Sequence, residues 1–545
     1  MDFALFCTRV SVLVLLLALC SPNKFIQSPV DFDPLNLVQT TTTASVDFGR
    51  ILFNSPSAVL RPQSPRDISM LLVSLSSSSF SKVTVAARGA GHSIHGQAQA
   101  LDGIVIEMDS LPSNIEIHKR REGESGFSYA DVSGGALWME LLEESLKLAL
   151  APRSWTDYLY LSIGGTLSNG GISGQTFKYG PQISNVLQLE VVTGEGELVT
   201  CSPTKDSELF NAVLGGLGQF GIITRARILL QDAPEKVKWV RAFYDYFHTF
   251  SRDQELLLSM PDSVDYLEGF IVLNEQSLHS SSIAFPAHME FIPDFGTKAN
   301  SKVYYCIEFV VHEYQDKRTN ADQVVEEISR QMSYMPSQMY TVEVSYFDFL
   351  NRVRIEEMSL RRRGLWEVPH PWLNMFVPKS GINQIRDLVM DNISADDFEG
   401  PILIYPFLRD KWDTNTSVVL PEATPGSGEQ VIYVVGMLRS ANPKSCSGGC
   451  LDEILHRNTW LAKTAREHAG AKQYLAHHPS LSQWTDHFGR HWHRFADRKS
   501  RFDPRCILSP GQEIFSRIYA STSSRRCQDL INVYGDHLTF QATHE

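Results

Sequence analysis

The sequence of 545 residues predicts a two-domain α+β protein, and three observations lead to this fold class. The chain is longer than one ordinary domain and can bury a large core. Its first half contains two glycine-rich loops near predicted strands, at residues 89–96 and 162–174. After Pro234 the pattern changes, because residues 237–440 favour longer strands and helices with few such loops. We therefore expect a first domain organised by ligand-binding loops and a second domain with helices on one face of a sheet.

The composition is that of a globular protein, with 43% hydrophobic and 20% charged residues. The net charge of −13 argues against a nucleic-acid partner and against an anionic membrane surface, since both repel an acidic protein. We expect a protein that binds neither, and a monomer by default.

The N-terminus has the pattern of a signal peptide. Arg9 precedes an apolar run from Val10 to Cys20 that is interrupted only by Ser11, and polar residues follow. The run is too short to span a membrane and fits a signal-peptide core, so we assign residues 1–20 to the signal and 21–54 to a polar lead-in. The secretory pathway follows from this, with the extracellular space as the expected destination; the vacuole and the endoplasmic reticulum stay open.

Two glycosylation acceptor sites fit that route, at Asn392 and Asn415. Six cysteines remain after the signal, which is too few for a disulfide-built fold in a chain of this length. Cys446 and Cys450 are close enough for a local bridge, although the sequence does not determine the pairing.

The first domain begins with a helix whose start is marked by Ser64 and Pro65 and which runs to Leu75. Apolar patterns then predict strands at 83–87, 103–108, 127–132 and 222–230, helices at 137–148 and 207–214, and a hairpin of 187–192 with 198–200.

The first glycine-rich loop follows the strand at 83–87 and contains His92. Glycines let the backbone approach a ligand closely, and successive amides in such a turn suit a phosphate. We interpret the stretch as a flavin loop with His92 joined covalently to the isoalloxazine ring. Taken alone, the pattern also fits an ordinary turn with a surface histidine.

The second loop, residues 162–174, carries five glycines with Ser, Thr and Asn between them. Loops of this length in compact domains are usually functional, and its amides and hydroxyls suit a pyrophosphate and a flavin ring edge. The alternative is a mobile surface loop.

A third glycine cluster, Gly216, Gly218 and Gly221, matches the dinucleotide-binding fingerprint by letter only. That fingerprint requires a strand before it and a helix after it, whereas here a helix precedes and a strand follows. A nicotinamide site of the Rossmann kind is therefore not supported.

The second domain is predicted to contain strands at 237–244, 266–273, 303–311, 401–407 and 431–438, with helices at 248–260 and 322–333. A loop at 446–450, a charged helix at 451–469 and a Pro/Gly turn near 509–512 follow. His487, His491 and His493 have spacing that suits a metal, but no carboxylate or thiolate cluster accompanies them, so we predict no metal site.

Several motifs together resemble the plant cytokinin dehydrogenases, which are flavoproteins of the vanillyl-alcohol-oxidase type. The motifs are Gly91-His92-Ser93, the segments 155–159 (WTDYL), 164–171 (GGTLSNGG), 265–270 (DYLEGF) and 369–374 (PHPWLN), and the terminal 508–512 (LSPGQ). The resemblance covers essentially the whole chain after the signal. It implies an FAD-binding domain of the split, PCMH-like type, formed by residues 55–236 and 446–545, with an antiparallel-sheet substrate domain inserted at 237–445.

The resemblance also implies roles for individual residues. His92 would be the residue linked to FAD. The other cofactor-binding residues would be Ala87, Gly89, Gly91, Ser93, Gln97, Asp157, Ser162, Ser168, Ile172, Ile222, Tyr474, Ser509 and Gln512. Trp372 and Asn374 would shape the adenine pocket, although a tryptophan between prolines also fits simple packing.

The implied reaction cleaves the N6 side chain of cytokinins such as isopentenyladenine and zeatin. A hydride leaves the carbon beside the exocyclic amine for the flavin, and the resulting imine is hydrolysed to adenine and an aldehyde. A carboxylate that accepts the amine proton would assist, and we assign this role to Asp157 with Glu268 orienting it or a water. Without the family, Asp157 also fits a turn cap and Glu268 a solvent-facing strand position.

Two other functions compete with this interpretation. A secreted carbohydrate or aldonolactone oxidase shares the superfamily, but its bicovalent subgroup needs a cysteine near the second loop and none lies between Tyr158 and Val199. A non-catalytic cytokinin-binding protein need not keep His92, Asp157 and Glu268 together. A quinone-type acceptor or oxygen would reoxidise the flavin.

Overall fold

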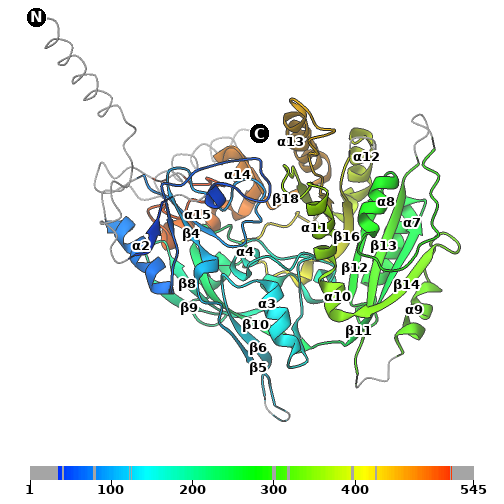
Figure 1. The fold of residues 1–545 in the computed structure, drawn as a ribbon, viewed down its shortest axis with the longest axis horizontal. Coiled ribbons are helices and arrows are strands. Elements are labelled where there is room, and N and C mark those ends of the chain that lie inside the picture. Colours follow the sequence, from blue (N-terminus) through cyan, green and yellow to red (C-terminus); the bar gives the residue numbers. More distant parts are fainter. Residues whose placement is uncertain are drawn as a thin grey trace, which may run out of the picture.

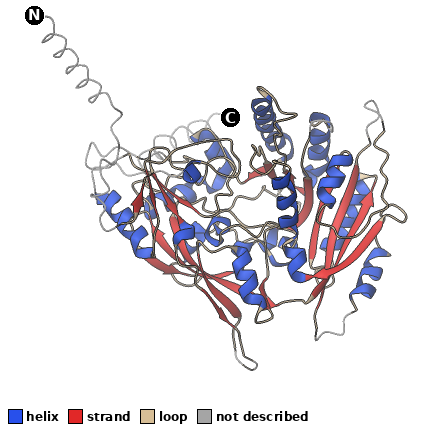
Figure 2. Ribbon diagram, in the orientation of Figure 1, coloured by secondary structure: helices blue, strands red, loops and turns tan. Residues whose placement is uncertain are grey.

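The computed structural model describes residues 35–39, 42–77, 82–121, 123, 125–296, 302–315, 320–394, 398–423, 426–515 and 517. The predicted signal peptide lies outside these residues. Three β-sheets organise the described residues, with four and six strands up to Asp232 and eight after it. The two smaller sheets lie on one side of the molecule and the eight-stranded sheet on the other (Figures 1 and 2). The predicted two-part α+β architecture with a large antiparallel sheet is confirmed.

The four-stranded sheet supports the first glycine-rich loop. Its order is β1 (Leu37–Val38), β2 (Ala58–Leu60), β4 (Ile104–Glu107) and β3 (Val85–Arg88), and β2, β4 and β3 are parallel. Helix α2 (Pro65–Ser77) crosses from β2 to β3 and buries Ile68, Leu71, Leu72 and Leu75, the spacing of one helical face. Strand β3 therefore releases the chain into the His92 loop at the carboxyl edge of a packed sheet.

The six-stranded sheet is antiparallel and follows it. Its strands are β5 (Ile115–His118), β6 (Ser128–Ser133), β10 (Gly221–Asp232), β8 (Val186–Thr193) and β9 (Leu198–Cys201), with β7 (Leu150–Pro152) paired to the end of β10. The predicted β8–β9 hairpin is confirmed. Helix α6 (Ser207–Val213) precedes the glycines at 216–221 and β10 follows them, the reverse of the dinucleotide fingerprint.

The eight-stranded sheet forms the second domain. Its order is β14 (Met339–Ser345), β11 (Lys236–Tyr244), β13 (Tyr304–Glu313), β12 (Tyr266–Val272), β16 (Ile402–Leu408), β17 (Val431–Met437), β15 (Leu373–Pro378) and β18 (Lys472–Tyr474). Side chains alternate between its faces. Tyr244 faces α7 (Phe247–Leu258), donating to Asp253 at 3.0 Å, while Arg241 and Glu268 point to the opposite face. One face is thus left for the functional site.

The remaining helices connect or cover these sheets. In the first domain they are α3 (Trp138–Leu146), α4 (Ile163–Leu167) and α5 (Thr176–Tyr179). In the second they are α8 (Glu275–Ser282), α9 (Ala321–Ser329), α10 (Tyr346–Leu350), α11 (Arg352–Arg362) and α12 (Ile382–Asn392), followed by α13 (Cys450–Ala469), α14 (Leu481–Phe488) and α15 (Trp492–Phe502). Short 3₁₀ turns lie at Thr42–Ser45, Met108–Ser110, Gln182–Asn185, Lys379–Gly381, Arg409–Lys411 and Gly489–His491.

The second glycine-rich segment differs from the long open loop that the sequence predicts. Its first residues form helix α4, in which Ile163 and Leu167 are buried. The Gly164 amide donates to the Gly134 carbonyl at 2.8 Å, and a Cβ on Gly164 would lie 3.0 Å from that oxygen. The glycines therefore serve tight packing of a helix as well as an open loop.

The C-terminal segment returns to the first domain later than the predicted boundary at 445. Strand β18 pairs with β15, so the large sheet continues to Tyr474. Beyond it, Leu508 forms a parallel bridge with Val85 of β3. Buried Lys499 and Asp503 pair at 2.8 Å, and the Asp503 carboxylate also accepts from the amides of residues 507 and 508. These contacts hold the C-terminal segment beside strand β3 of the first domain.

The cysteines and acceptor asparagines can now be located. Cys446 and Cys450 form the local disulfide that the spacing allows, Cys506 is also disulfide-bonded, and Cys201 and Cys306 are buried and free. Asn415 is exposed in a loop, whereas half-buried Asn392 ends α12 and donates to the Leu388 carbonyl.

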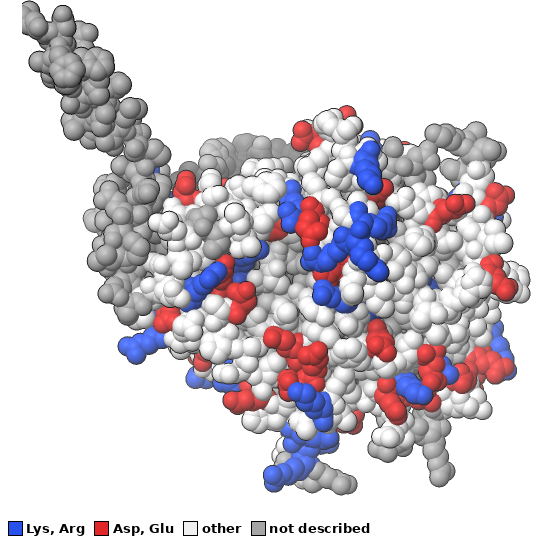
Figure 3. All heavy atoms as spheres, in the orientation of Figure 1, with Lys and Arg blue, Asp and Glu red and all other residues white. Residues whose placement is uncertain are grey.

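Acidic and basic side chains alternate over the face viewed in Figure 3, where the basic ones form small groups. Among the described residues, none of the helices combines the length and hydropathy that a membrane span requires.

We predict that packing of the C-terminal segment against the His92 loop depends on Gly511. A Cβ there would lie 1.8 Å from the Gly96 carbonyl oxygen in the His92 loop, so Gly511→Ala forces the two segments apart at a cost of about 3 kcal/mol. Gly470→Ala is the control, because Gly470 has a positive φ but no atom closer than 3.9 Å and should cost about 1 kcal/mol. Thermal unfolding should show the larger loss of Tm for Gly511→Ala. Equal losses of Tm in the two variants would contradict the close packing at Gly511.

Candidate active site

A cavity of about 520 Å³ lies between the glycine-rich loops of the first domain and the open face of the eight-stranded sheet. Its wall contains most of the residues predicted from the sequence, which come from both ends and the middle of the chain. They are Ala87, Gly89, Gly91, His92, Ser93, Gln97, Asp157, Ser162, Ser168, Ile172, Ile222, Glu268, Trp372, Asn374, Tyr474 and Gln512.

Ser509 is the exception among the predicted residues. Its buried hydroxyl donates to the Phe515 carbonyl at 2.9 Å, and its neighbours Leu508 and Pro510 line the cavity instead. The structure therefore gives the Ser509 side chain a role in the turn that ends the described chain, at one remove from the cavity.

Asp47 of the lead-in holds the His92 loop in shape. Its carboxylate accepts from the Ser93 hydroxyl at 2.9 Å and from the Gly96 amide at 2.6 Å. Gln97 adds a second internal brace by accepting from the amides of residues 94 and 95. These bonds fix the loop from within and from the lead-in.

The His92 ring is held by aromatic contacts. It stacks on Phe48 with 3.9 Å between ring centroids. His370 also stacks on Phe48, with 4.1 Å between their centroids. Burial lowers the pKa of His92 to about 4, so the imidazole is neutral at physiological pH. Its Nε2 atom has no hydrogen-bond partner among the described residues. A neutral, oriented imidazole at a cavity wall is suited to act as a nucleophile.

The second glycine-rich segment meets the first directly. A Cβ on Gly89 would lie 1.8 Å from the Ser162 hydroxyl, so the Ser162 side chain approaches the Gly89 backbone as closely as glycine allows. Ser168 donates to the Gly164 carbonyl at 2.7 Å, and the Tyr474 hydroxyl accepts from the Gly171 amide at 3.2 Å. Tyr474 thereby ties the last strand of the large sheet to this segment.

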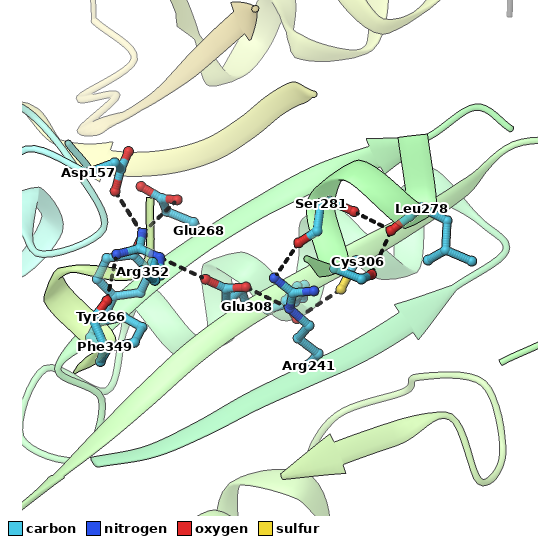
Figure 4. Close-up of polar contacts among 12 residues, drawn as sticks. Asp157, Arg241, Tyr266, Glu268, Leu278, Ser281, Cys306, Glu308, Phe349 and Arg352 are labelled. Carbon is cyan, nitrogen blue, oxygen red and sulfur yellow. Dashed lines mark hydrogen bonds and ion pairs between the residues drawn. The ribbon is translucent and has the colours of Figure 1, made fainter. Parts of the chain in front are cut away.

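Asp157 lines the cavity and lies beside Arg352 and Glu268 of the second domain (Figure 4). Arg352 Nη2 lies 2.8 Å from its Oδ1 atom, and the Tyr266 hydroxyl donates to the same oxygen at 3.1 Å. Arg352 also donates to Tyr266. The carboxylate is thus fixed by a cation and a phenol. The next residue, Tyr158, approaches the His92 ring to 5.0 Å between centroids.

Glu268 is the second carboxyl group of this corner. It lies on β12 with Arg352 Nη2 at 3.9 Å from Oε2, while its Oε1 atom is buried without a hydrogen-bond partner among the described residues. Burial and the Asp157 charge raise the pKa of Glu268 well above its ordinary value, against the lowering effect of Arg352. The raised pKa favours the neutral form of Glu268 beside an Asp157 that is paired with a cation.

The sequence interpretation missed several residues of this site. Arg241 and Glu308 lie in strands whose other residues are largely apolar, and a charge inside such a strand signals a buried pair. Arg352 and Glu356 are spaced i, i+4 on α11, a pattern that resembles an ordinary surface helix. Glu356 lines the cavity, and burial raises its pKa to about 7.

The predicted substrate residues also lie at the cavity. Trp372 meets Phe48 edge-on at 5.2 Å between centroids, next to the His92 contact. Asn374 lies on β15 opposite Tyr474 of β18. Of the predicted histidine trio, His487 is buried against Trp484 and Phe488, and no group of three or more potential metal ligands converges within the described parts of the chain.

The residues present fit a flavin dinucleotide. Glycine backbones at 89 and 91 border the cavity next to His92, which leaves room for a pyrophosphate to approach amides. Ile172, Ile222 and Val85 offer apolar surface for a planar ring, and the unpartnered His92 is available for a covalent link.

Comparison with known proteins finds matches to both parts of the chain. Residues 234–515 match the family described as "Cytokinin dehydrogenase 1, FAD and cytokinin binding", and residues 56–202 match "FAD binding domain". The chain is 74% identical over 524 residues to cytokinin dehydrogenase 3 of Oryza sativa subsp. japonica, covering 96% of this chain and 99% of that protein. Cytokinin dehydrogenase 1 of Arabidopsis thaliana is 46% identical over 479 residues, covering 86% and 80%.

A solved structure supports the fold alone. The VAO-type flavoprotein MtVAO615 from Myceliophthora thermophila C1 has a TM-score of 0.61 and 16% identity, covering 86% of this chain and 81% of that one. The fold that the resemblance implies, that of a VAO-type flavoprotein, is confirmed.

We predict that neutral, buried His370 makes stability depend on pH. Its Nε2 contacts the Trp366 carbonyl at 2.9 Å and its Nδ1 contacts Ser440 at 3.0 Å, and burial lowers its pKa to about 4. As pH falls from about 6.5 to about 4, His370 binds a proton in the unfolded chain but stays neutral in the folded one. The free energy of unfolding therefore decreases by up to about 1.4 kcal/mol per pH unit because of this group.

Urea unfolding at several pH values tests this linkage. His370→Gln should show a shallower loss of unfolding free energy across that window than the unaltered chain. His456→Gln, an exposed histidine on α13, should leave the slope unchanged. Identical slopes in all three proteins would rule out the buried neutral state of His370.

Proposed function

This chain belongs to the cytokinin dehydrogenases, FAD-dependent enzymes that degrade cytokinins, and we propose that it cleaves the N6 side chain of isopentenyladenine and zeatin. The carbon beside the exocyclic amine loses a hydride and the amine nitrogen loses a proton, which leaves an imine. Water then hydrolyses the imine to adenine and an unsaturated aldehyde. Bound FAD supplies the hydride acceptor, and the protein supplies orientation and proton transfer.

The observation that carries this proposal is the pairing of Asp157 with Arg352 and Tyr266. The next residue in the chain, Tyr158, contacts the His92 ring, so this pairing lies near His92. A carboxylate held at this position can accept the amine N–H and favour departure of the hydride from the neighbouring carbon. Arg352 stabilises the charged form of Asp157 before the proton arrives. Glu268, whose side chain lies beside the same guanidinium, would orient Asp157 or a water.

His92 is the residue that would hold FAD covalently. Its neutral state and its free Nε2 atom support this, since a protonated imidazole has no lone pair for a bond. The glycine backbones at 89 and 91, together with Ser93 and Gln97, would surround the pyrophosphate and ring, and Gln512 would close the site from the chain end. Trp372 and Asn374 would face the adenine ring.

The route of the protein is also part of the proposal. The pattern of residues 1–20 favours export, exposed Asn415 is the more accessible glycosylation acceptor, and half-buried Asn392 is the less accessible one. We expect an extracellular monomer whose flavin is reoxidised by a quinone-type acceptor or by oxygen.

We predict that Asp157→Asn slows flavin reduction by isopentenyladenine by at least about 100-fold, because the amide cannot accept the amine proton. Anaerobic stopped-flow absorbance measures this step without the acceptor. Asp387→Asn, an exposed carboxylate on α12, should reduce at the unaltered rate. An Asp157→Asn enzyme with an unaltered reduction rate would overturn the assignment of the base.

We predict that His92→Ala binds FAD without a covalent bond. Acid precipitation should leave flavin in the protein pellet of the unaltered chain and release it to the supernatant from His92→Ala. His95→Ala is a matched control in the same loop, where His95 stacks on His477 at 4.7 Å, and should keep flavin in the pellet. Retention of flavin by His92→Ala would place the link elsewhere.

A further inference from the structure

A row of buried charged side chains crosses the large sheet next to the place where Arg352 pairs with Asp157. Register brings Glu268 of β12 opposite Glu308 of β13, and Glu308 opposite Arg241 of β11. All three side chains are buried, with exposed fractions of 6%, 4% and 3%. Neighbouring strands lie about 5 Å apart, so the row is continuous. It connects the active site to the far part of the sheet.

Arg352 lies above this row and contacts both carboxyl groups of the sheet. Its Nη2 lies 3.9 Å from Glu268 and its Nε lies 3.8 Å from Glu308, while Nη2 also reaches Asp157 at 2.8 Å. The guanidinium carbon lies 4.7 Å from the Phe349 ring centroid and 5.0 Å from that of Tyr266. Cation–π contacts with two rings and three carboxyl partners hold the group in one orientation.

Arg241 secures Glu308 from the other side. Arg241 Nε donates to Glu308 Oε2 at 2.7 Å, and its Nη2 donates to the Ser281 carbonyl at the end of α8 at 2.8 Å. Figure 4 shows these contacts as one chain from Asp157 through Arg352, Glu308 and Arg241 to α8. Glu308 is therefore shared between two guanidinium groups, and it competes with Asp157 for Arg352.

We propose that Arg352 is a positioning residue that keeps Asp157 charged and aimed at the substrate amine, and that Glu308 tunes this effect by drawing part of the Arg352 charge toward the sheet. The inference rests on the proposed role of Asp157 as the base. It assigns to Arg241, Glu308 and Arg352 one electrostatic function that none of them performs by touching substrate.

The charge balance of the corner supports this assignment. Two carboxylates (Asp157 and Glu308) face two guanidinium groups (Arg352 and Arg241), so these four charges balance. Burial opposes the charge of Arg352, but the surrounding Tyr266 and carboxyl groups raise its pKa above the ordinary value, so it stays charged. The ionisable groups that surround Asp157 from all packed elements are Arg352 and Glu356 of α11, Tyr266 and Glu268 of β12, Glu308 of β13 and Tyr405 of β16.

Opposite charge changes should move the pH profile of flavin reduction in opposite directions. Arg352→Gln removes a cation 2.8 Å from Asp157, so the ionised carboxylate is less favoured and the profile should shift about 1 to 3 pH units higher. Glu308→Gln removes an anion that competes for Arg352, so the profile should shift lower by up to about 1 unit. A merely structural role would lower the rate at every pH without these opposite shifts.

Anaerobic stopped-flow reduction by isopentenyladenine between pH 5 and 9 measures both profiles, with flavin content per chain as a check on folding. Arg352→Lys keeps the charge and should restore the pH profile while losing rate, because lysine cannot reproduce the planar fork. Arg362→Gln, an exposed arginine on the same helix, should leave profile and rate unchanged. If Arg352→Gln loses its flavin, the pH profiles of Glu308→Gln and Arg352→Lys still test the proposal.

The outcomes separate this inference from the proposed function. An unshifted profile in Glu308→Gln and Arg352→Gln, with a slow Asp157→Asn enzyme, would overturn the role of Arg352 and leave Asp157 as the base. An Asp157→Asn enzyme that reduces flavin at the unaltered rate would overturn the base itself. Shifts in opposite directions, absent from Arg362→Gln, would support both.

Discussion

The contact between Asp157 and Arg352 joins the two domains at the point where chemistry is expected. Asp157 comes from the segment between β7 and α4, while Arg352 and Tyr266 come from the second domain. Buried charges are costly unless paired, so each domain supplies what the other needs. The Asp157 carboxylate is therefore fully held only when both domains are assembled.

The flavin side of the cavity shows the same dependence on distant segments. Phe48 of the lead-in stacks on both His92 and His370, and His370 comes from the second domain. Lys499 and Asp503 fasten the chain end beside β3. A split domain of this kind is folded around its insertion, and its cofactor loops are braced by residues hundreds of positions away.

The sequence predicted the fold best where one local pattern decides the outcome. Helix α2, the β8–β9 hairpin and the five apolar strands of the second domain follow from periodicity and turn residues. Helix α4 was missed because glycine-rich sequence favours a loop, and tertiary contact with Gly134 overrides that preference. Arg352 and Glu308 were missed because their importance arises from strand register and helix packing, which a local pattern does not contain.

The most direct measurement for this account is an anaerobic titration of the purified protein with isopentenyladenine, followed by flavin absorbance and by analysis of the products. The account predicts that one equivalent of isopentenyladenine bleaches the flavin and yields one equivalent of adenine. A yellow protein that stays oxidised with excess isopentenyladenine, or a protein purified without flavin, would contradict it.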